Sequence, residues 1–224
     1  MTRPLIIAID GPSASGKSTL GRMLARELGL LYIDTGSMYR AVALAVIESS
    51  ANERDDLSVT SLAEQIKIDL AGDPDSLRVS LNGRDVTGRI RDDDVTRVSS
   101  IVSTIPAVRR AMVRQQRELG RAGAVMNGRD IGTVVFPDAD IKFFLDAGVA
   151  ERAERRLAEE RVNNPGAQYE QTLADITDRD RRDTMREDSP LAAADDAIVI
   201  DSTGLSIKEV LQSMLAKVRE RNAL

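Results

Sequence analysis

The chain has 224 residues, 42% of them hydrophobic and 30% charged, and it contains no His, Cys or Trp. These absences exclude a His general base, a Cys nucleophile, a Ser-His-Asp triad, a zinc site built from thiolates or imidazoles, and any disulfide. The length indicates one domain, and the net charge of −5 argues against a basic surface for nucleic acid. Of the 31 basic residues, 26 are Arg. This excess reflects either GC-rich codon usage or a need for planar groups that bind phosphate.

The first elements alternate between strand and helix patterns. Residues 5–9 form an apolar run typical of a buried parallel strand, and Leu20, Met23, Leu24 and Leu28 then recur with helical spacing until Gly29. A second strand is predicted at 31–33 and a second helix at 38–47. Asp10 ends the first apolar run, which argues against a secretory signal, and no apolar stretch approaches the roughly 18 residues of a membrane span. We therefore expect a soluble, cytoplasmic protein that binds no membrane.

The middle of the chain has a different pattern. Residues 50–60 are polar and are predicted to form a linker. Asn82-Gly83 at the centre of an alternating segment, 77–86, indicates a β-hairpin, and helices are predicted at 92–101 and 108–119. We interpret residues 55–105 as an inserted αβ lobe of a single domain that covers residues 1–224.

The alternation resumes after this lobe. Strands are predicted at 124–126, 141–145 and 197–200, with helices at 151–162, 171–187 and 207–218. The second half of 171–187 has almost no apolar face, as in a helix that is solvated or lines a polar cleft. This order predicts an α/β fold with a parallel sheet between two layers of helices.

One motif carries specific chemistry. A P-loop pattern, G-x-x-x-x-G-K-[ST], lies between a predicted strand and a predicted helix and is matched by Gly11, Pro12, Ser13, Ala14, Ser15, Gly16, Lys17 and Ser18. These residues and the following Thr19 are the expected nucleotide-binding residues. The loop's N–H groups would surround a phosphate, Lys17 would reach the β- and γ-phosphates, and the Ser18 hydroxyl would bind Mg²⁺. The motif predicts binding of a nucleoside triphosphate, but it occurs in switches, motors and kinases alike.

The missing His bears on the acceptor. A phosphate anion can attack a γ-phosphoryl group without a general base, so that alignment and charge neutralisation suffice. Abundant Arg suits that case, although an Asp remains an alternative base for a hydroxyl acceptor.

Further segments resemble the bacterial cytidylate kinases of the nucleoside-monophosphate kinase family, over nearly the whole chain. They are residues 9–12 before the P-loop, 34–40 (DTGSMYR), 127–137 (NGRDIGTVVFP), 179–183 (RDRRD) with Arg186, and 200–203 (IDST). The resemblance implies a P-loop kinase fold with a five-stranded parallel sheet flanked by helices, an inserted monophosphate-binding lobe at 55–105 and a short lid at 151–168. It also implies transfer of a phosphoryl group from ATP, with Mg²⁺, to CMP or dCMP by a monomer.

The same resemblance assigns roles to individual residues. Lys17 and Arg129 are the expected catalytic residues. Arg40 and Arg129 match the arginines that hold the acceptor phosphate, while Ser100, Arg109 and Asp130 match the residues that read cytosine; a shift from Ser100 to Ser99 remains open. Thr35, Arg179, Asp183 and Arg186 match further nucleotide contacts, the last three on one helical face. Lid residues Arg152, Arg155 and Arg156 are alternatives for neutralising the transferred group, and Asp34 either supports Mg²⁺ or holds its loop.

Two kinds of alternative remain. One is another small P-loop kinase that acts on AMP, UMP or shikimate. The other is a regulatory P-loop NTPase, which would hydrolyse its nucleotide without an acceptor.

Overall fold

The computed structural model describes residues 4–162 and 164–222. Residues 1–3, where the sequence-based argument about a secretory signal begins, and Asn163 within the predicted lid lie outside the described residues. Over the two described ranges, no helix combines the length and the apolar character needed to cross a bilayer.

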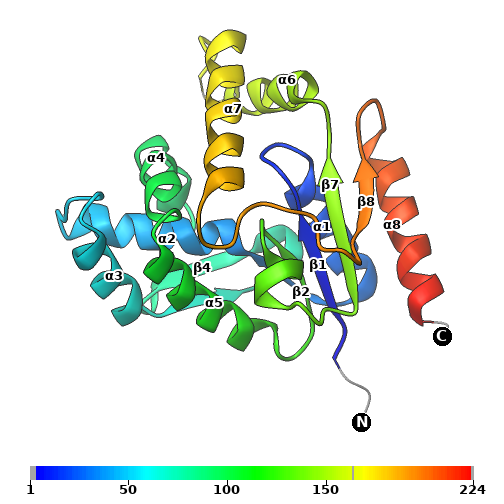
Figure 1. Cartoon of the computed structure of the whole chain (residues 1–224), viewed down its shortest axis with the longest axis horizontal. Coiled ribbons are helices and arrows are strands. Elements are labelled where there is room, and N and C mark those ends of the chain that lie inside the picture. The colour runs from blue at the N-terminus through cyan, green and yellow to red at the C-terminus, as the bar shows by residue number, and fades with distance from the viewer. Residues whose placement is uncertain (1–3, 163, 223–224) are drawn as a thin grey trace.

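A five-stranded parallel sheet forms the centre of the molecule (Figure 1), as the alternation predicts. The strands lie in the order β2-β6-β1-β7-β8, with bounds β1 Ile6–Asp10, β2 Leu31–Asp34, β6 Ala124–Asn127, β7 Ile141–Asp146 and β8 Ile198–Asp201. The chain runs from β1 to one edge and later returns to the other side of β1 at β7. The strand order therefore reverses beside β1, and ligands of open α/β sheets bind at the carboxyl ends of the strands next to such a reversal.

Helices cover both faces of the sheet, and all five residues of β1 are therefore buried. Ile7 and Ile9 pack toward α1 (Lys17–Leu28) and α8 (Ile207–Asn222). Ile6 and Ala8 belong to the second core, which includes residues from α2 (Thr35–Glu48), α3 (Asp56–Gln65), α4 (Asp93–Val102) and α5 (Pro106–Gly120). Side chains of consecutive strand residues point to opposite faces, so one apolar strand contributes to both cores.

The inserted segment forms a small αβ unit. Helix α3 (Asp56–Gln65) leads into an antiparallel sheet of β3 (Ile68–Ala71), β4 (Arg78–Leu81) and β5 (Arg84–Asp85), with short 3₁₀ turns at Pro74–Ser76 and Arg89–Arg91. The hairpin predicted at Asn82-Gly83 is confirmed, and both residues have positive φ, 51° and 81°.

The predicted linker at 50–60 is wrong in its second half, where α3 begins. The Asp55 side chain accepts hydrogen bonds from the N–H groups of Leu57 and Ser58 and so caps the helix. Val59 and Ala63, one turn apart, are buried against the lobe. Two buried apolar residues in a largely polar segment are a weak helical signal, and tertiary packing supplies the remaining stability.

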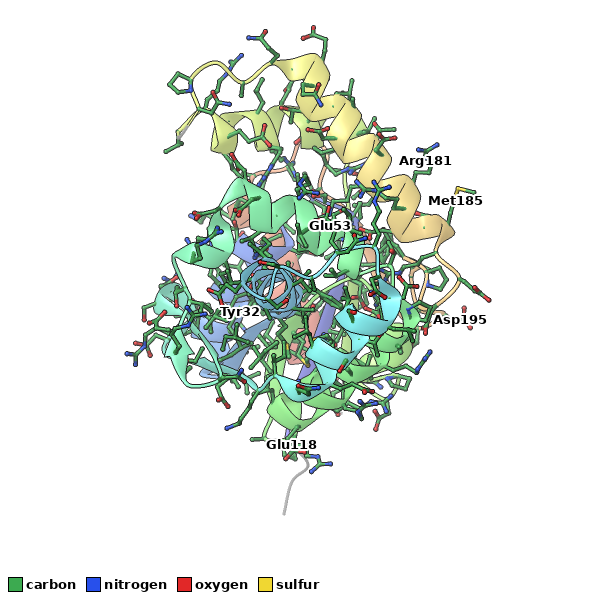
Figure 2. All side chains as sticks on the ribbon, turned by 90° about the vertical axis from the view of Figure 1, so that its left-hand side faces the viewer. Tyr32, Glu53, Glu118, Arg181, Met185 and Asp195 are labelled. Atoms are coloured by element: carbon green, nitrogen blue, oxygen red, sulfur yellow. The ribbon has the colours of Figure 1, made fainter. Side chains whose placement is uncertain are left out.

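Two helices lie at the top of Figure 1, α6 (Val149–Glu160) and α7 (Tyr169–Met185). Figure 2 shows Arg181 and Met185 of α7 pointing away from the body, and both are exposed. Helix α7 ends at Met185, two residues before the predicted end, and Arg186 is its C-cap with ψ 143°. The Arg186 side chain still lies beside Asp183 and lines the same cavity as Arg179 and Asp183.

Candidate active site

The P-loop crosses from β1 to α1 in a conformation that requires glycine at two positions. Gly11 has φ 144°, and a Cβ there would lie 2.0 Å from the carbonyl oxygen of Leu145 on β7. Gly16, with φ 88°, is the N-cap of α1. The first glycine permits close approach to the neighbouring strand and the second permits the left-handed turn that leads into the helix. The loop thus presents a helix N-terminus, which favours an anion.

Lys17 is buried beneath this loop. Its Nζ donates hydrogen bonds to the Pro12 carbonyl and, at 3.2 Å, to Ser15 Oγ. Burial, followed by the positive charge of Arg129, holds the pKa of Lys17 well below its ordinary value. An anion bound in the loop would favour the charged ammonium, because it supplies the counter-charge that the protein provides only in part.

A cavity of about 420 Å³ extends from the P-loop to the lobe. Most of the predicted site residues line it: residues 13–19 of the P-loop, with Thr35, Arg40, Arg109, Arg129, Asp130, Arg179, Asp183 and Arg186. Gly11, Pro12 and Ser100 are not among its lining residues. One continuous cavity therefore joins the triphosphate loop to the predicted acceptor residues.

A buried ion pair stands at the lobe end of the cavity. Arg109 Nη2 lies 2.5 Å from Asp130 Oδ2, and the two side chains are only 2% and 7% exposed. The Arg109 guanidinium also lies over the ring of Tyr39, 5.4 Å from its centroid, and donates to the Ser103 carbonyl. Although burial lowers the pKa of Arg109, Tyr39 and Asp130 outweigh burial and raise it. A strong donor and a carboxylate acceptor are thus placed side by side, the complement of a base edge with both kinds of group.

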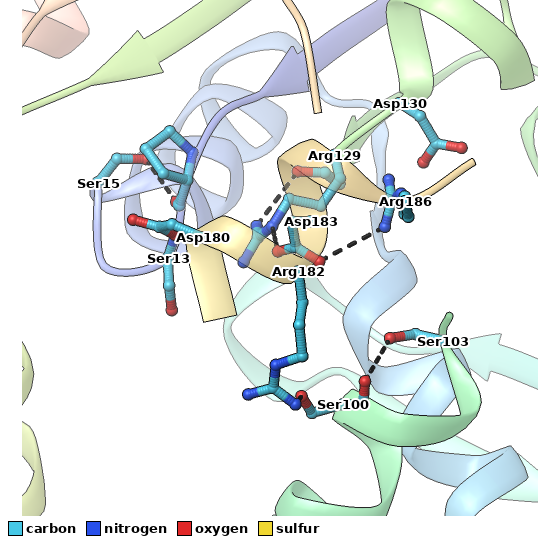
Figure 3. A network of polar contacts seen from close by, with 12 residues as sticks. Ser13, Ser15, Ser100, Ser103, Arg129, Asp130, Asp180, Arg182, Asp183 and Arg186 are labelled. Carbon is cyan, nitrogen blue, oxygen red and sulfur yellow. Dashed lines mark hydrogen bonds and ion pairs between the residues drawn. The ribbon is translucent and has the colours of Figure 1, made fainter. Parts of the chain in front are cut away.

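Arginines gather between the two ends of the cavity, as Figure 3 shows around Asp183. Arg129 Nε lies 2.8 Å from Asp183 Oδ2, and Arg186 Nη1 lies 3.5 Å from Asp183 Oδ1. Burial and the charge of Arg129 lower the pKa of Arg179 to about 10. Burial raises the pKa of Asp183, but Arg129 and Arg179 outweigh it and hold the pKa below its ordinary value. One carboxylate among so many cations leaves a region suited to phosphate groups.

Asp10, the last residue of β1, holds the loop that follows Arg129 and Asp130. Its carboxylate accepts hydrogen bonds from the N–H groups of Ile131 (2.8 Å) and Gly132 (2.7 Å), at the start of the π-helical turn Ile131–Val135. Burial raises the pKa of Asp10 to about 6 despite these two donors. Arg129 and Asp130 lie directly before this turn, so Asp10 ties them to the strand that precedes the P-loop.

Asp34 and Asn127 lie beside Ser18. Asn127 Nδ2 donates to Ser18 Oγ (3.0 Å) and to Asp34 Oδ1 (3.4 Å). Asp34 caps α2 by accepting from Gly36 N, and it also accepts from Arg40 Nη2 at 3.2 Å. Asp34 therefore has the loop-holding contacts that one sequence-based alternative gave it, and it lines the cavity as well.

The structure separates neighbouring candidates on the same helices. Ser100 Oγ accepts a hydrogen bond from Arg182 of α7 at 2.5 Å, whereas Ser99 and Ser103 line the cavity. Among the lid arginines, Arg155 and Arg156 line the cavity, and Arg152 is buried against other groups.

Sequence reasoning did not single out Tyr39, Ser103 or Asn127, which also line the cavity. Tyr39 stands within the DTGSMYR segment and Asn127 begins the NGRD segment. Their places in those segments were the available signal. Ser103 carried none, because only the packing of α4 brings it to the cavity wall.

Five cavity-lining side chains have a buried polar atom with no hydrogen-bond partner among the described residues. The atoms are Tyr39 OH, Arg40 Nε, Arg109 Nε, Asn127 Oδ1 and Arg186 Nη2. Buried polar groups in folded proteins are normally paired. Their concentration around one cavity indicates a site for a highly polar ligand.

Comparisons with known proteins agree with this geometry. A family model described as cytidylate kinase matches residues 7–220. A cytidylate kinase of Solibacter usitatus is 49% identical, covering 97% of this chain and 93% of its own length, and one of Bacillus velezensis is 44% identical, covering 99% and 100%. A solved structure of an uncharacterised protein from Eubacterium ventriosum shares the fold with a TM-score of 0.53 and 12% identity, covering 96% of this chain and 98% of that one. The match over almost the whole chain shows that this chain belongs to the cytidylate kinase family.

Proposed function

We propose that this protein transfers the γ-phosphoryl group of ATP to CMP or dCMP, giving ADP and CDP or dCDP. The observation that carries the proposal is the single cavity that joins the P-loop to the buried Arg109–Asp130 pair. It is lined by arginines that include buried nitrogens with no hydrogen-bond partner in the described part of the chain. Cytosine offers an amino donor at N4 for Asp130 and acceptors at N3 and O2 for Arg109. Uracil would place O4 against the carboxylate and an N–H against the guanidinium, which mismatches both pairs.

The reaction in this proposal is a direct in-line transfer. A phosphate oxygen of CMP attacks the γ-phosphorus, the bond from that phosphorus to the β,γ-bridging oxygen breaks, and ADP leaves with the electron pair. The attacking oxygen is already anionic, so no general base is required. Lys17 and Arg129 neutralise the charge of the transferred group, Arg40 holds the acceptor phosphate, and the cavity walls align the two nucleotides.

Mg²⁺ fits the oxygen donors beside the P-loop. Ser18 Oγ lies next to Asp34 and to Asn127, whose Oδ1 is buried and has no partner among the described residues. Among those residues there is no cluster of three acidic side chains suited to a metal, so most ligands would come from nucleotide phosphates and water. When bound, the ion would offset the negative charge of the nucleotide phosphates.

The same proposal includes closure of two parts of the chain on the bound nucleotides. The unit at 55–105 closes on the monophosphate, and the segment 151–168 closes as a lid with Arg155 and Arg156 facing the cavity. Closure excludes water from the γ-phosphoryl group. Both ends of the cavity come from one chain, so the proposed reaction needs no residue from a second copy.

A screen of acceptors tests the proposal. ADP formation from Mg²⁺-ATP is measured with CMP, dCMP, UMP, AMP or shikimate, and without acceptor. We expect CMP and dCMP to give a kcat/KM at least about tenfold above the others, because a mismatched buried polar group costs on the order of 1–3 kcal/mol. Faster reaction with AMP contradicts the assignment of Asp130 and Arg109, and rapid hydrolysis that no acceptor stimulates favours a regulatory NTPase.

A further inference from the structure

Within one turn, helix α7 contacts both the P-loop, which is expected to bind ATP, and Arg129, which is expected to bind the acceptor phosphate. Asp180 Oδ1 accepts a hydrogen bond from the N–H of Ser13, the third residue of the P-loop, at 3.3 Å. Three residues later, Asp183 accepts from Arg129 and lines the cavity. Figure 3 shows Asp180 next to Ser13 and Asp183 next to Arg129. Residues three apart lie on one side of a helix, so a rigid α7 places these two carboxylates relative to each other.

Arg152 of α6 completes the contact with the P-loop. Its guanidinium pairs with Asp180 Oδ2, and its Nη1 donates to the Ser13 carbonyl at 3.1 Å. Its Nε donates to the Ala147 carbonyl at 2.9 Å, so the guanidinium is also held by the loop before α6. The pair thereby holds both the N–H and the C=O of Ser13. Two polar backbone groups of one loop residue are thus fixed from outside the loop.

The chemistry of this contact points to positioning rather than phosphate binding. A carboxylate repels a triphosphate, and Arg152 neutralises that charge where the two side chains are only 19% and 8% exposed. Neither Asp180 nor Arg152 lines the cavity, so both act through Ser13. A P-loop binds phosphate only when its N–H groups converge, and that conformation is more populated when Ser13 is held in place.

We propose that Asp180 is a positioning residue for the donor nucleotide, although it lies on the helix that carries acceptor contacts. Together with Arg152 it fixes Ser13, and through α7 it keeps the P-loop aligned with Asp183 and Arg129. The proposal rests on the function proposed above for its acceptor side, but its donor side concerns ATP binding alone. It assigns the two carboxylates to different nucleotides, Asp180 to the phosphoryl donor, ATP, and Asp183 to the phosphoryl acceptor, CMP.

The test compares Asp180→Ala and Asp180→Asn with a matched control, Asp178→Ala, which removes an exposed carboxylate of the same helix that pairs with Arg181. Calorimetry gives the Kd for Mg²⁺-ATP without acceptor and the Kd for CMP without ATP, and steady-state assays give both KM values. We expect Asp180→Ala to raise the Kd and KM for ATP about tenfold, with those for CMP changed less than about twofold. Asp183→Ala should instead raise the Kd and KM for CMP and change those for ATP less. Asp178→Ala should have the same constants as the parent protein.

Asp180→Asn separates geometry from charge. It keeps an oxygen acceptor for the Ser13 N–H but loses the charge that pairs with Arg152, so we expect an ATP Kd about two- to threefold above that of the parent. If the carboxylate acted only by repelling phosphate, both variants would bind ATP more tightly, which would overturn the proposal. Equal losses for ATP and CMP, or an unchanged ATP Kd, would do the same.

Thermal unfolding checks that each variant is folded. Where Asp180→Ala fails to fold, Asp180→Asn carries the test, and an unchanged or lower ATP Kd overturns the proposal. A protein that binds ATP but phosphorylates no nucleoside monophosphate contradicts the proposed function, while the ATP Kd still decides the role of Asp180.

Discussion

The buried Arg109–Asp130 pair gives the strongest quantitative prediction. With 2% and 7% exposure and 2.5 Å between Nη2 and Oδ2, neither group has appreciable contact with water. Removing one partner leaves the other charge buried without a counter-charge, which lowers the free energy of unfolding by about 3–5 kcal/mol. Replacing both partners by apolar residues often leaves that free energy nearly unchanged. We therefore expect Arg109→Met and Asp130→Leu each to lose about 3–5 kcal/mol of unfolding free energy. The double variant should lose less than either.

The assay is a double-mutant cycle by urea unfolding at pH 7.5, followed by circular dichroism because the chain has no Trp. Each single variant should also melt about 6–20 °C below the parent, at about 2–4 °C per kcal/mol for a domain of this size. The Arg84–Glu48 pair has the same 2.5 Å separation but exposed side chains, and as the control it should show far weaker coupling that salt screens. Additive losses for Arg109 and Asp130 would refute the reasoning, since uncoupled groups cannot compensate each other's burial.

Three further predictions concern activity. Lys17→Met should lower kcat about 100-fold or more while thermal unfolding stays near that of the parent, and near-normal turnover would remove Lys17 from the mechanism. Asp10, with a pKa of about 6, is about 10% protonated at pH 7 and about 90% at pH 5. Only the ionised carboxylate accepts fully from both N–H groups, so kcat/KM for CMP should fall as the pH decreases through 6. The Asp10→Asn variant should show a lower kcat/KM that depends less on pH. If the variant kept the same loss of kcat/KM at acid pH as the parent, Asp10 would be excluded as the cause of that loss. Asp130→Asn should lower kcat/KM for CMP about 10–100-fold and narrow its preference over UMP, because an amide can donate to uracil O4; equal losses for both acceptors would indicate a structural aspartate.

The sequence alone determined the parts of the protein that depend on local pattern. The apolar run of β1, the P-loop and the helical spacing after Lys17 lie next to each other in the chain, and each confirms the interpretation of the next. The parallel sheet followed from the strand-helix alternation, and most of the predicted site residues do line one cavity. Helix α3 escaped detection because Val59 and Ala63 are its only buried residues, and their packing partners are distant in sequence.

Tertiary structure decided which of several neighbouring residues faces the cavity. The chain pattern does not distinguish Ser99 from Ser100, because the rotation of α4 is set by the core it packs against, and Arg182 of α7 then bonds Ser100. Similarly, Arg152 is buried because Asp180, 28 residues further along, meets it at Ser13. Helical periodicity specifies which residues share a face, but only long-range packing sets the direction of that face. For that reason sequence identified the phosphate loop and the candidate arginines, while the contact between Asp180, Arg152 and Ser13 emerged only from the fold.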